Sequence, residues 1–209
     1  ITDLVAAHPQ GFALLGSICL TSASHIGVLL DGQNRPVRNA FLWSDQRSTE
    51  QVSNLLQFED EIFAITANRP STSWTLPHFL WIKEKEPEVY ERMKRVCFSK
   101  DYLVHWLTGR WVTDPATAVS SMLYDYKQSI WSSRLLSCLD ISPVQLPEVI
   151  GPCEVVGTLL PAIAIQFGLP MNVVVVNGSL DSATETYGAG ARAANDVVIR
   201  IGTAGGIDK

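Results

Sequence analysis

The sequence predicts an α/β fold with a helical segment in its middle, and three patterns support this prediction. The run Val173–Val176 is β-branched throughout, which is typical of a strand buried on both faces. Residues 13–20 near the start form another apolar run. Between them, residues 66–150 show closely spaced helix signals. We therefore expect strands near the two ends of the chain and a helical insertion at 66–150.

The N-terminal part is expected to contain two buried strands, at residues 13–20 and 26–30. The residues Asp31-Gly32-Gln33-Asn34 are typical of a tight turn. They predict a hairpin that leads from the second strand to a third segment ending at Trp43.

Helices are expected after Trp43 and throughout the middle of the chain. The first has Val52, Leu55 and Leu56 on its apolar face, and its N-cap is Ser44 or Asp45. Proline, glycine and capping residues then mark the bounds of further helices, at residues 75–86, 87–95, 101–108, 114–121, 131–139 and 161–167.

The carboxyl end of the strand at Val173 is the most informative part of the chain. The strand runs into Gly178-Ser179-Leu180-Asp181, and a helix is expected over residues 182–194. Open α/β sheets bind ligands at the carboxyl ends of their strands, which favours a catalytic role for Asp181. Aspartate is also a preferred N-cap, and the local pattern leaves both roles open.

A further strand, residues 197–201, ends in the loop Gly202-Thr203-Ala204-Gly205-Gly206. Small residues let backbone N–H groups approach a phosphate closely, although hairpin turns use the same residues. Gly188, Gly190 and Ala193 have the spacing of a dinucleotide-binding fingerprint, but they close a helix instead of opening one. The acid and the loop together indicate phosphoryl transfer.

Composition and charge disfavour several classes of protein. The 209 residues are 46% hydrophobic and 18% charged, which suits one globular domain or one large lobe. The net charge of -5 and the lack of a basic stripe argue against a nucleic-acid partner. No apolar run approaches the roughly 18 residues of a membrane span. We expect a soluble, cytoplasmic protein without a membrane partner.

The four cysteines lie far apart, and no Cys or His pair has the spacing of a metal site. They are expected to be reduced and buried.

Four other residues are candidates for ligand binding: His25, Trp43, Asp45 and Arg47. Each has an ordinary explanation when taken alone: a hydrogen-bonded structural histidine, a core tryptophan, a helix cap and a surface arginine. Their order along the chain, together with other motifs, is more specific.

This order of motifs resembles the FGGY family of carbohydrate kinases almost from end to end. The matching segments include Ser22-Ala23-Ser24-His25, Leu29-Leu30-Asp31-Gly32, Trp43-Ser44-Asp45-Gln46-Arg47, residues 73–81, Lys100-Asp101-Tyr102-Leu103, Leu107-Thr108-Gly109, Thr113-Asp114, Leu146-Pro147, Gly168-Leu169-Pro170, Gly178-Ser179-Leu180-Asp181, Gly188-Ala189-Gly190 and Gly202-Thr203. The resemblance implies an actin-like, ribonuclease-H-like lobe, the N-terminal half of a two-lobed sugar kinase. Residues 197–209 then begin the link toward a second lobe.

The resemblance also implies roles for individual residues. Asp181 matches the catalytic base, which accepts the proton of the sugar hydroxyl that attacks the γ-phosphate of ATP. Gly202 and Thr203 match the loop that touches the ATP phosphates. The cofactors implied are ATP and Mg²⁺.

His25, Trp43, Asp45 and Arg47 match positions that line or border the sugar pocket. An aromatic face with polar edges suits a substrate that has C–H faces and many hydroxyls. The motifs look most like the xylulokinase-type branch, so the expected substrate is a sugar or polyol, with a pentulose such as xylulose as the best match.

Some features depart from the family pattern. The first phosphate motif, Asp-x-Gly-Thr, and the adenosine-binding lobe are absent, so residues 1–209 alone are expected to be an inactive piece of a longer protein. Ser22-Ala23 replaces a common Gly-Gln pair, and His78 replaces a lysine. These changes bear on the substrate more than on the reaction class. A homodimer is one of the assemblies open to such a protein.

Two other functions are open at this point. One is a catalytically silent sugar-binding protein, which the intact Asp181 and Gly202-Thr203 disfavour. The other is an actin-like ATPase on the same fold, which would hydrolyse ATP without any sugar.

Overall fold

The computed structural model describes residues 1–193, 195–200 and 206–208, and its fold is α/β, as predicted. Its α-helices are α1 (Thr2–Ala7), α2 (Pro9–Ala13), α3 (Thr49–Leu56), α4 (Glu59–Thr66), α5 (Thr75–Lys85), α6 (Pro87–Glu91), α7 (Ser99–Thr108), α8 (Pro115–Ser120), α9 (Ser133–Leu136), α10 (Pro161–Phe167) and α11 (Asp181–Gly188). Short 3₁₀-helices are η1 (Ser137–Leu139) and η2 (Pro143–Gln145). The strands are β1 (Ser17–Ser22), β2 (Gly27–Leu30), β3 (Arg95–Phe98), β4 (Val112–Thr113), β5 (Tyr124–Asp125), β6 (Ile130–Trp131), β7 (Glu148–Val149), β8 (Val155–Thr158), β9 (Val174–Leu180), β10 (Val198–Arg200) and β11 (Gly206–Asp208).

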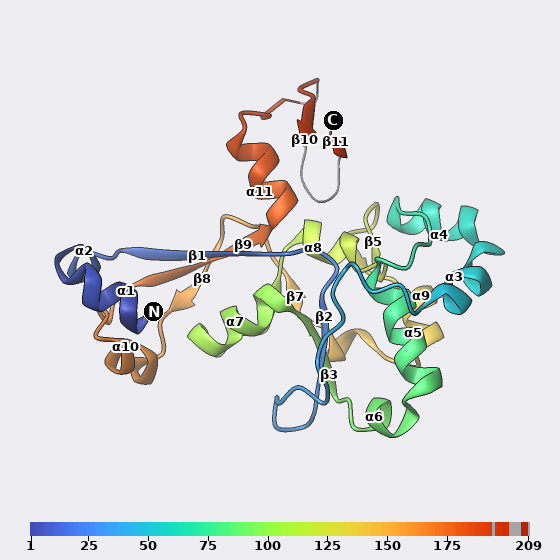
Figure 1. Cartoon of the computed structure of the whole chain (residues 1–209), viewed down its shortest axis with the longest axis horizontal. Helices are drawn as coiled ribbons and strands as arrows, with labels where there is room; N and C mark the ends of the chain where they lie inside the picture. Colours follow the sequence, from blue (N-terminus) through green and yellow to red (C-terminus); the bar gives the residue numbers. More distant parts are fainter. Residues whose placement is uncertain (194, 201–205, 209) are drawn as a thin grey trace.

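The main sheet lies at one end of an elongated molecule and has the strand order β1, β9, β8 (Figure 1). β1 is parallel to β9, and β8 is antiparallel to it. Helix α7 packs against all three strands. Because β1 and β9 are parallel, their last residues, Ser22 and Leu180, lie side by side at the same edge of the sheet. Asp181 follows directly at this edge.

A bulge interrupts β9 shortly before that edge. The register between β1 and β9 shifts between Cys19 and Thr21. Gly178 lies at the shift with a φ of 75°, and a Cβ atom there would clash with the carbonyl oxygen of Leu20. Glycine is therefore required at this position, both for its backbone conformation and for the close approach of β1.

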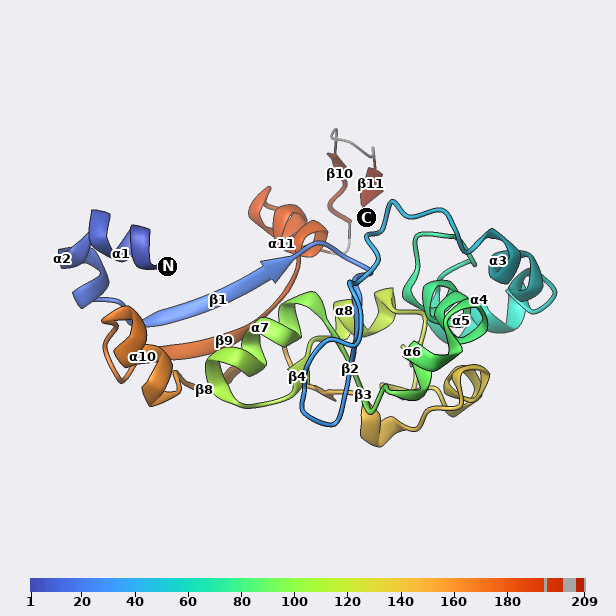
Figure 2. The same ribbon diagram turned by 60° about the horizontal axis from the view of Figure 1, so that its bottom comes forward.

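The other described strands form two-stranded ladders. β2 pairs with β3, β5 with β6, and β10 with β11, each antiparallel, whereas β4 and β7 are parallel. Figure 2 shows α1, α2 and α10 together at the sheet end and α3 to α6 at the opposite end.

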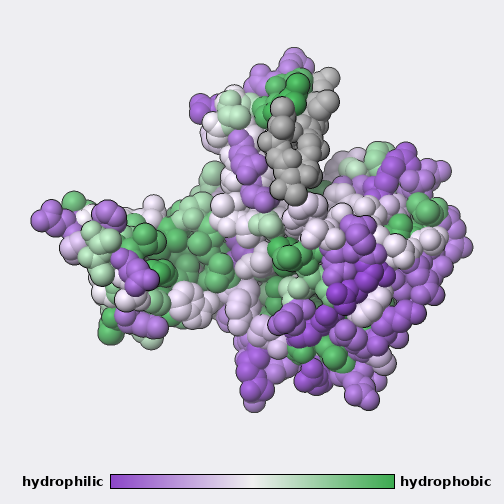
Figure 3. Space-filling model, in the orientation of Figure 1, coloured by the Kyte–Doolittle hydropathy of each residue, from purple (hydrophilic) through white to green (hydrophobic). Residues whose placement is uncertain are grey.

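The two largest clusters of the apolar core lie at these two ends. The larger cluster lies among the helices and strands of the opposite end, where Leu76 and Leu139 are fully buried. The smaller cluster lies between the main sheet, α7 and α10, and includes Val175. Large apolar side chains also reach the surface at the sheet end, as Leu14 and Ile165 do at 87% and 73% exposure. Figure 3 shows hydrophobic residues gathered on this end of the visible face.

The predicted hairpin after β2 is wrong beyond its turn. The turn itself forms, with Asn34 in the left-handed region at φ 60°. Only an isolated bridge between Leu30 and Pro36 follows it, and β2 pairs with β3 instead. Proline has no N–H to donate to a ladder, so no third strand forms.

The bounds of several other elements differ from prediction. The helix predicted at residues 87–95 ends at Glu91, and Arg95 begins β3. β1 begins at Ser17 and not at residue 13, because Pro9 starts a helix that continues to Ala13. α11 ends at Gly188 and not at residue 194. Gly190 follows with a φ of 100°, a backbone conformation that does not continue a helix.

Helix α3 begins later than predicted. It starts at Thr49 with Ser48 at the N-cap position, so Ser44 and Asp45 lie in the preceding loop. Leu55 is buried, as predicted for the apolar face.

All four cysteines are free, but only Cys97 is buried. Cys19 and Cys153 are exposed and Cys138 is half-buried, so the prediction of four buried thiols is wrong. Cys19 lies on β1, where exposed and half-buried residues alternate because one face of the strand is open. Within the described residues, no helix has the length and apolar character needed to cross a membrane.

Candidate active site

Asp181 is the first residue of α11 and directly follows the buried end of β9. Its Oδ1 accepts hydrogen bonds from the hydroxyl of Ser24, at 3.1 Å, and from the backbone N–H of Ser182, at 2.8 Å. Leu180 takes the N-cap position, so the carboxylate lies in the first turn, where the helix dipole favours negative charge. Ser24 comes from the loop after β1, and the two parallel strands thus meet at this carboxylate.

His25 follows Ser24 and adopts a left-handed backbone conformation, with φ 65°. Its Nδ1 lies 3.1 Å from the carbonyl oxygen of Ser120. Because a carbonyl oxygen only accepts, Nδ1 carries the proton, and Nε2 of the neutral ring is an acceptor. Burial lowers the pKa of His25, although the Ser120 bond and the nearby Asp181 carboxylate act in the opposite direction. The ring is therefore neutral at pH 7.

The start of α5 holds His25 in place. The Trp74 ring meets the imidazole edge-on, with ring centroids 4.2 Å apart. The hydroxyl of Thr75 donates to the carbonyl oxygen of His25 at 3.0 Å. A Cβ atom at Gly27 would clash with Thr75 and Phe79, so glycine allows β2 to lie close against this helix.

Asp45 and Arg47 form an ion pair in the loop before α3. Nε of Arg47 donates to both carboxylate oxygens, at 2.9 and 3.1 Å. The guanidinium lies over the rings of Phe41 and Trp81, 4.4 and 5.0 Å from their centroids. Partial burial acts to raise the pKa of Asp45, but the hydrogen bonds and charge of Arg47 outweigh it and lower this pKa overall.

His78 connects this ion pair to the region of His25. It lies on α5, is 2% exposed, and places Nε2 3.3 Å from the carbonyl oxygen of Asp45. Burial lowers the pKa of His78, more than its contacts with Asp45 raise it. A charge on His78 would lower the pKa of His25, so the two imidazoles lie within electrostatic reach of each other. One helix therefore supports both groups of candidate residues.

The described part of the structure does not join the remaining predicted site residues, Trp43, Gly202 and Thr203, to the others. Trp43 lies in the turn closed by the hydrogen bond from Asp45 N–H to Leu42 O, with its side chain half-buried. Among the described residues, no hydrogen bond or ring contact joins Trp43 to the other candidates. Gly202 and Thr203 lie outside the described residues.

Sequence reasoning missed three contributors to this arrangement: Ser24, Trp74 and Ser120. Ser24 and Trp74 lie inside segments that resemble the FGGY family, so these segments could have identified them as candidates. Ser120 contributes only its carbonyl oxygen, and no side-chain pattern reports a backbone contact of this kind.

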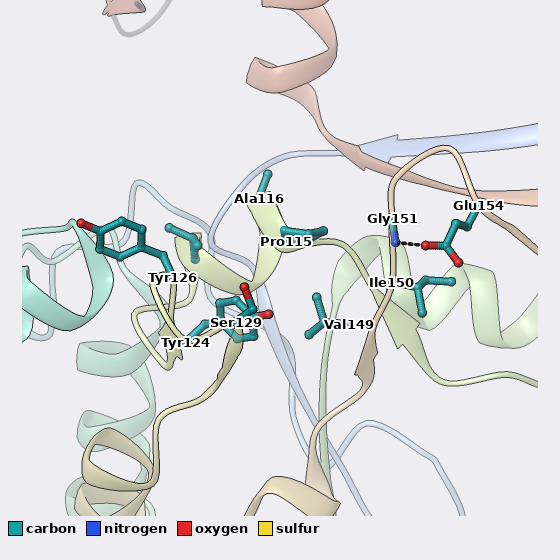
Figure 4. A pocket seen from close by; sticks show the side chains of 10 residues that line it. Pro115, Ala116, Tyr124, Tyr126, Ser129, Val149, Ile150, Gly151 and Glu154 are labelled. Atoms are coloured by element: carbon teal, nitrogen blue, oxygen red, sulfur yellow. Dashed lines mark hydrogen bonds between the residues drawn. The ribbon is translucent and has the colours of Figure 1, made fainter. Parts of the chain in front are cut away.

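A cavity of about 630 Å³ lies beside α8, away from these residues (Figure 4). Its lining includes the rings of Tyr124 and Tyr126 and the turn from Gly151 to Glu154, and it includes none of the predicted site residues. Within the described part of the chain, no group of three or more His, Cys, Asp or Glu side chains is arranged to hold a metal ion.

Comparison with known proteins decides the family. The profile of the N-terminal domain of the FGGY family of carbohydrate kinases matches residues 13–188. This chain belongs to the FGGY family of carbohydrate kinases. It is 33% identical over 192 residues to the xylulose kinase of Lactococcus lactis and 34% identical over 181 residues to that of Escherichia coli. These matches cover 91% and 87% of this FGGY chain but only 38% and 37% of the two relatives.

Solved structures confirm the predicted actin-like lobe of a sugar kinase. A "xyloylose kinase" from Brucella ovis matches 98% of the FGGY chain with a TM-score of 0.93 and 30% identity. The xylulose kinase of Rhodospirillum rubrum matches 99% of it with a TM-score of 0.92 and 27% identity. The FGGY chain covers 42% and 43% of those two structures, so it spans less than half of each.

Proposed function

We propose that this chain is most of the sugar-binding lobe of an ATP-dependent carbohydrate kinase whose substrate is a pentulose such as xylulose. The placement of Asp181 beside His25, at the shared edge of β1 and β9, is the observation that carries the proposal. Membership of the FGGY family and the similarity to xylulose kinases support the reaction class.

Asp181 is the proposed general base. The sugar hydroxyl gives its proton to the carboxylate while its oxygen attacks the γ-phosphorus, and the bond from that phosphorus to the bridging oxygen breaks to release ADP. Both described hydrogen bonds to the carboxylate go to Oδ1, from Ser24 and Ser182. They fix the orientation of the group, which supports proton transfer through Oδ2.

The sugar is proposed to lie between Asp181 and the loop of Asp45 and Arg47. Nε2 of the neutral His25 ring would accept a hydrogen bond from one sugar hydroxyl. The Asp45 carboxylate and the Arg47 guanidinium offer acceptors and donors for others, and Trp43 offers an aromatic face. This set suits a neutral polyhydroxylated ligand.

The proposed cofactors are ATP and Mg²⁺. Gly202 and Thr203 are assigned to the ATP phosphates by the family motif alone. Mg²⁺ likewise rests on the family, since the described residues hold no ready metal site, and no step above depends on it. When bound, Mg²⁺ would neutralise part of the negative charge of the phosphates.

The test is ADP release by the full-length parent protein with Mg-ATP against ketoses, aldoses, polyols and sugar acids. We expect a pentulose to stimulate release, and Asp181→Ala to reduce turnover by roughly 10²- to 10⁴-fold, the usual effect of losing a general base. Asp60→Ala is the matched control, because Asp60 is an exposed acid in the first turn of α4.

Three results would contradict the proposal. Near-normal turnover of Asp181→Ala would remove Asp181 from the mechanism. A lack of stimulation by any sugar would favour a silent sugar-binding protein. ATP hydrolysis that proceeds equally without sugar would favour an actin-like ATPase.

A further inference from the structure

A buried charged cluster lies behind the strand that leads to Asp181. We call it the Lys100 cluster, and its members are Lys100, Asp101, Asp114, Asn177 and Ser179. The three charged side chains are each at most 1% exposed. Burying ions is costly unless they are paired and hydrogen-bonded, and removing one partner leaves the others uncompensated. The arrangement of this cluster is therefore sensitive to each of its members.

Lys100 occupies the centre of the cluster. Its Nζ lies 3.1 Å from Oδ1 of Asp101 and 3.6 Å from Oδ1 of Asp114. It also donates to Asn177, to the side-chain Oδ1 at 3.0 Å and to the backbone oxygen at 3.2 Å. The ammonium thus joins the start of α7, the residue before α8 and the bulge of β9. None of these elements is adjacent to the others in the sequence.

The contacts of Asn177 extend this link to the turn after β7. Its side-chain amide donates to the carbonyl oxygens of Thr113 and Ile150, at 3.0 and 3.1 Å. Its backbone N–H donates to the carbonyl oxygen of Glu154, and the N–H of Gly178 donates to that of Pro152. Hydrogen bonds from both the side chain and the backbone therefore hold the bulge that precedes Asp181.

Figure 4 shows that the turn is itself closed, by the hydrogen bond from Gly151 N–H to the Glu154 carboxylate. The turn thus presents a defined set of carbonyl oxygens to Asn177 and Gly178. The backbone around the bulge is held from outside the strand as well as by its pairing with β1.

Asp114 links the same ammonium to the histidine side of the site. Its Oδ2 accepts from the N–H groups of Ala116 and Thr117, which caps α8, and from the hydroxyl of Ser179, at 2.6 Å. The other end of α8 is Ser120, whose carbonyl oxygen binds Nδ1 of His25. Asp114 therefore touches both β9, two residues before Asp181, and the helix that orients His25.

We propose that Lys100 is a positioning residue that sets the register between Asp181 and His25. It does so through Asn177 on the one side and Asp114 on the other, and it touches neither the site residues nor the sugar pocket. This inference rests on the proposed function, because it takes Asp181 as the base. In Lys100→Met, β9 and α8 should both still form, but they should be free to shift relative to each other.

The first test is a cycle of kinetic measurements on the full-length protein. A misplacement of about 1 Å can cost about 10²-fold in rate, so we expect Lys100→Met to lower kcat by about that factor with a smaller change in KM for ATP. In the Asp181→Ala background, the same substitution should lower the residual rate by less than about 3-fold, because there is no longer a base to position. Equal losses in both backgrounds would overturn the positioning role.

The second test does not depend on activity. Hydrogen exchange of the amides in residues 178–184 should accelerate in Lys100→Met, because the bulge loses its anchor. Lys83→Met is the matched control, since Lys83 also pairs with a carboxylate, that of Asp140, and with a carbonyl oxygen, that of Cys138, but lies on α5. It should leave exchange in residues 178–184 unchanged. Unchanged exchange in Lys100→Met would overturn the inference.

A milder variant covers the case in which Lys100→Met does not fold. Ser179→Ala removes only the hydrogen bond from β9 to Asp114 and should show the same effects on kcat and exchange at reduced size. Wild-type kcat and exchange in Ser179→Ala would overturn the link through Asp114. If Asp181→Ala keeps its turnover, the proposed function fails, whereas the exchange data still decide whether Lys100 holds β9.

Discussion

The two groups of residues in the candidate site are held by different kinds of structure. Asp181 follows a buried strand whose bulge is fixed by glycine, backbone hydrogen bonds and a buried ammonium. Asp45 and Arg47 lie in a loop, where aromatic rings and a buried imidazole hold them. Changes near Asp181 should therefore alter folding and turnover together, whereas changes around Arg47 should alter substrate affinity first.

The largest effect is expected from Gly178→Ala, which tests whether the strand side is as rigid as described. The added Cβ would meet the backbone of β1, and φ is 75°, so we expect a loss of about 3 kcal/mol or more in the free energy of unfolding. Urea unfolding of the full-length protein measures it. Gly157→Ala on β8 is the control, because a Cβ there meets no atom within 4 Å. Equal stability of the two variants would show that the bulge relaxes freely.

The loop side should respond differently, through affinity. Arg47→Lys loses the two-oxygen contact with Asp45 and the stacking on Phe41. We expect KM for the sugar to rise roughly 10-fold, in keeping with the loss of one charge-assisted hydrogen bond, with a smaller change in kcat. Steady-state kinetics of the full-length protein would show it. Arg35→Lys, at the exposed ion pair with Asp31, should change neither value.

His25, beside Asp181, predicts that KM for the sugar changes a few-fold with pH. Burial lowers the pKa of His25, so the neutral ring persists from pH 7 down through its ordinary value and is lost only at lower pH. Protonation converts Nε2 from an acceptor to a donor, and KM for the sugar should then rise. Kinetics from about pH 5 to about pH 8 test this. His25→Gln should remove the rise, and an unchanged profile in that variant would assign it to another group.

Asp101 gives the last prediction, on the stability side of the comparison. Burial raises its pKa to about 7, against the opposing effect of Lys100. A raised carboxyl pKa means that the folded state holds the proton more tightly. The stability gained from it is complete below the ordinary pKa of about 4 and is lost as pH rises through about 7.

The free energy of unfolding of wild type should therefore fall more between these pH values than that of Asp101→Asn, whose amide cannot titrate. The amide oxygen can still accept the hydrogen bond from Phe98 N–H, so the start of α7 is kept. Urea titrations at the two ends of this pH range give the difference in slope. Parallel slopes would mean that folding does not shift the pKa of Asp101.

Local chemistry was enough to predict some elements. Gly109 and Gly168 end α7 and α10 in the left-handed conformation, and Asp114 caps α8, close to the helix bounds that glycine, proline and capping residues predicted. The strand before Asp181 was predicted because a β-branched run has few alternatives.

Other features depend on contacts between distant parts of the chain. β3 pairs with β2 across a long stretch of sequence, but its first residue, Arg95, was predicted to end a helix, and no strand was predicted after it. The bond from His25 to Ser120 involves a backbone oxygen. Lys100 was visible within a motif, but nothing in its neighbours shows that its ammonium is buried. Pairing partners and buried charges are set by tertiary packing and are not encoded in a short window.

The left-handed backbone of His25 has a consequence for redesigning the proposed sugar pocket. A φ of 65° is readily adopted by glycine and tolerated by asparagine and aspartate, but it is strained for β-branched residues. In a mutant library aimed at new sugar acceptors, Val, Ile or Thr at position 25 would therefore lower the stability of the protein, whatever the acceptor. The backbone conformation therefore limits which residue types position 25 tolerates, independently of the ligand.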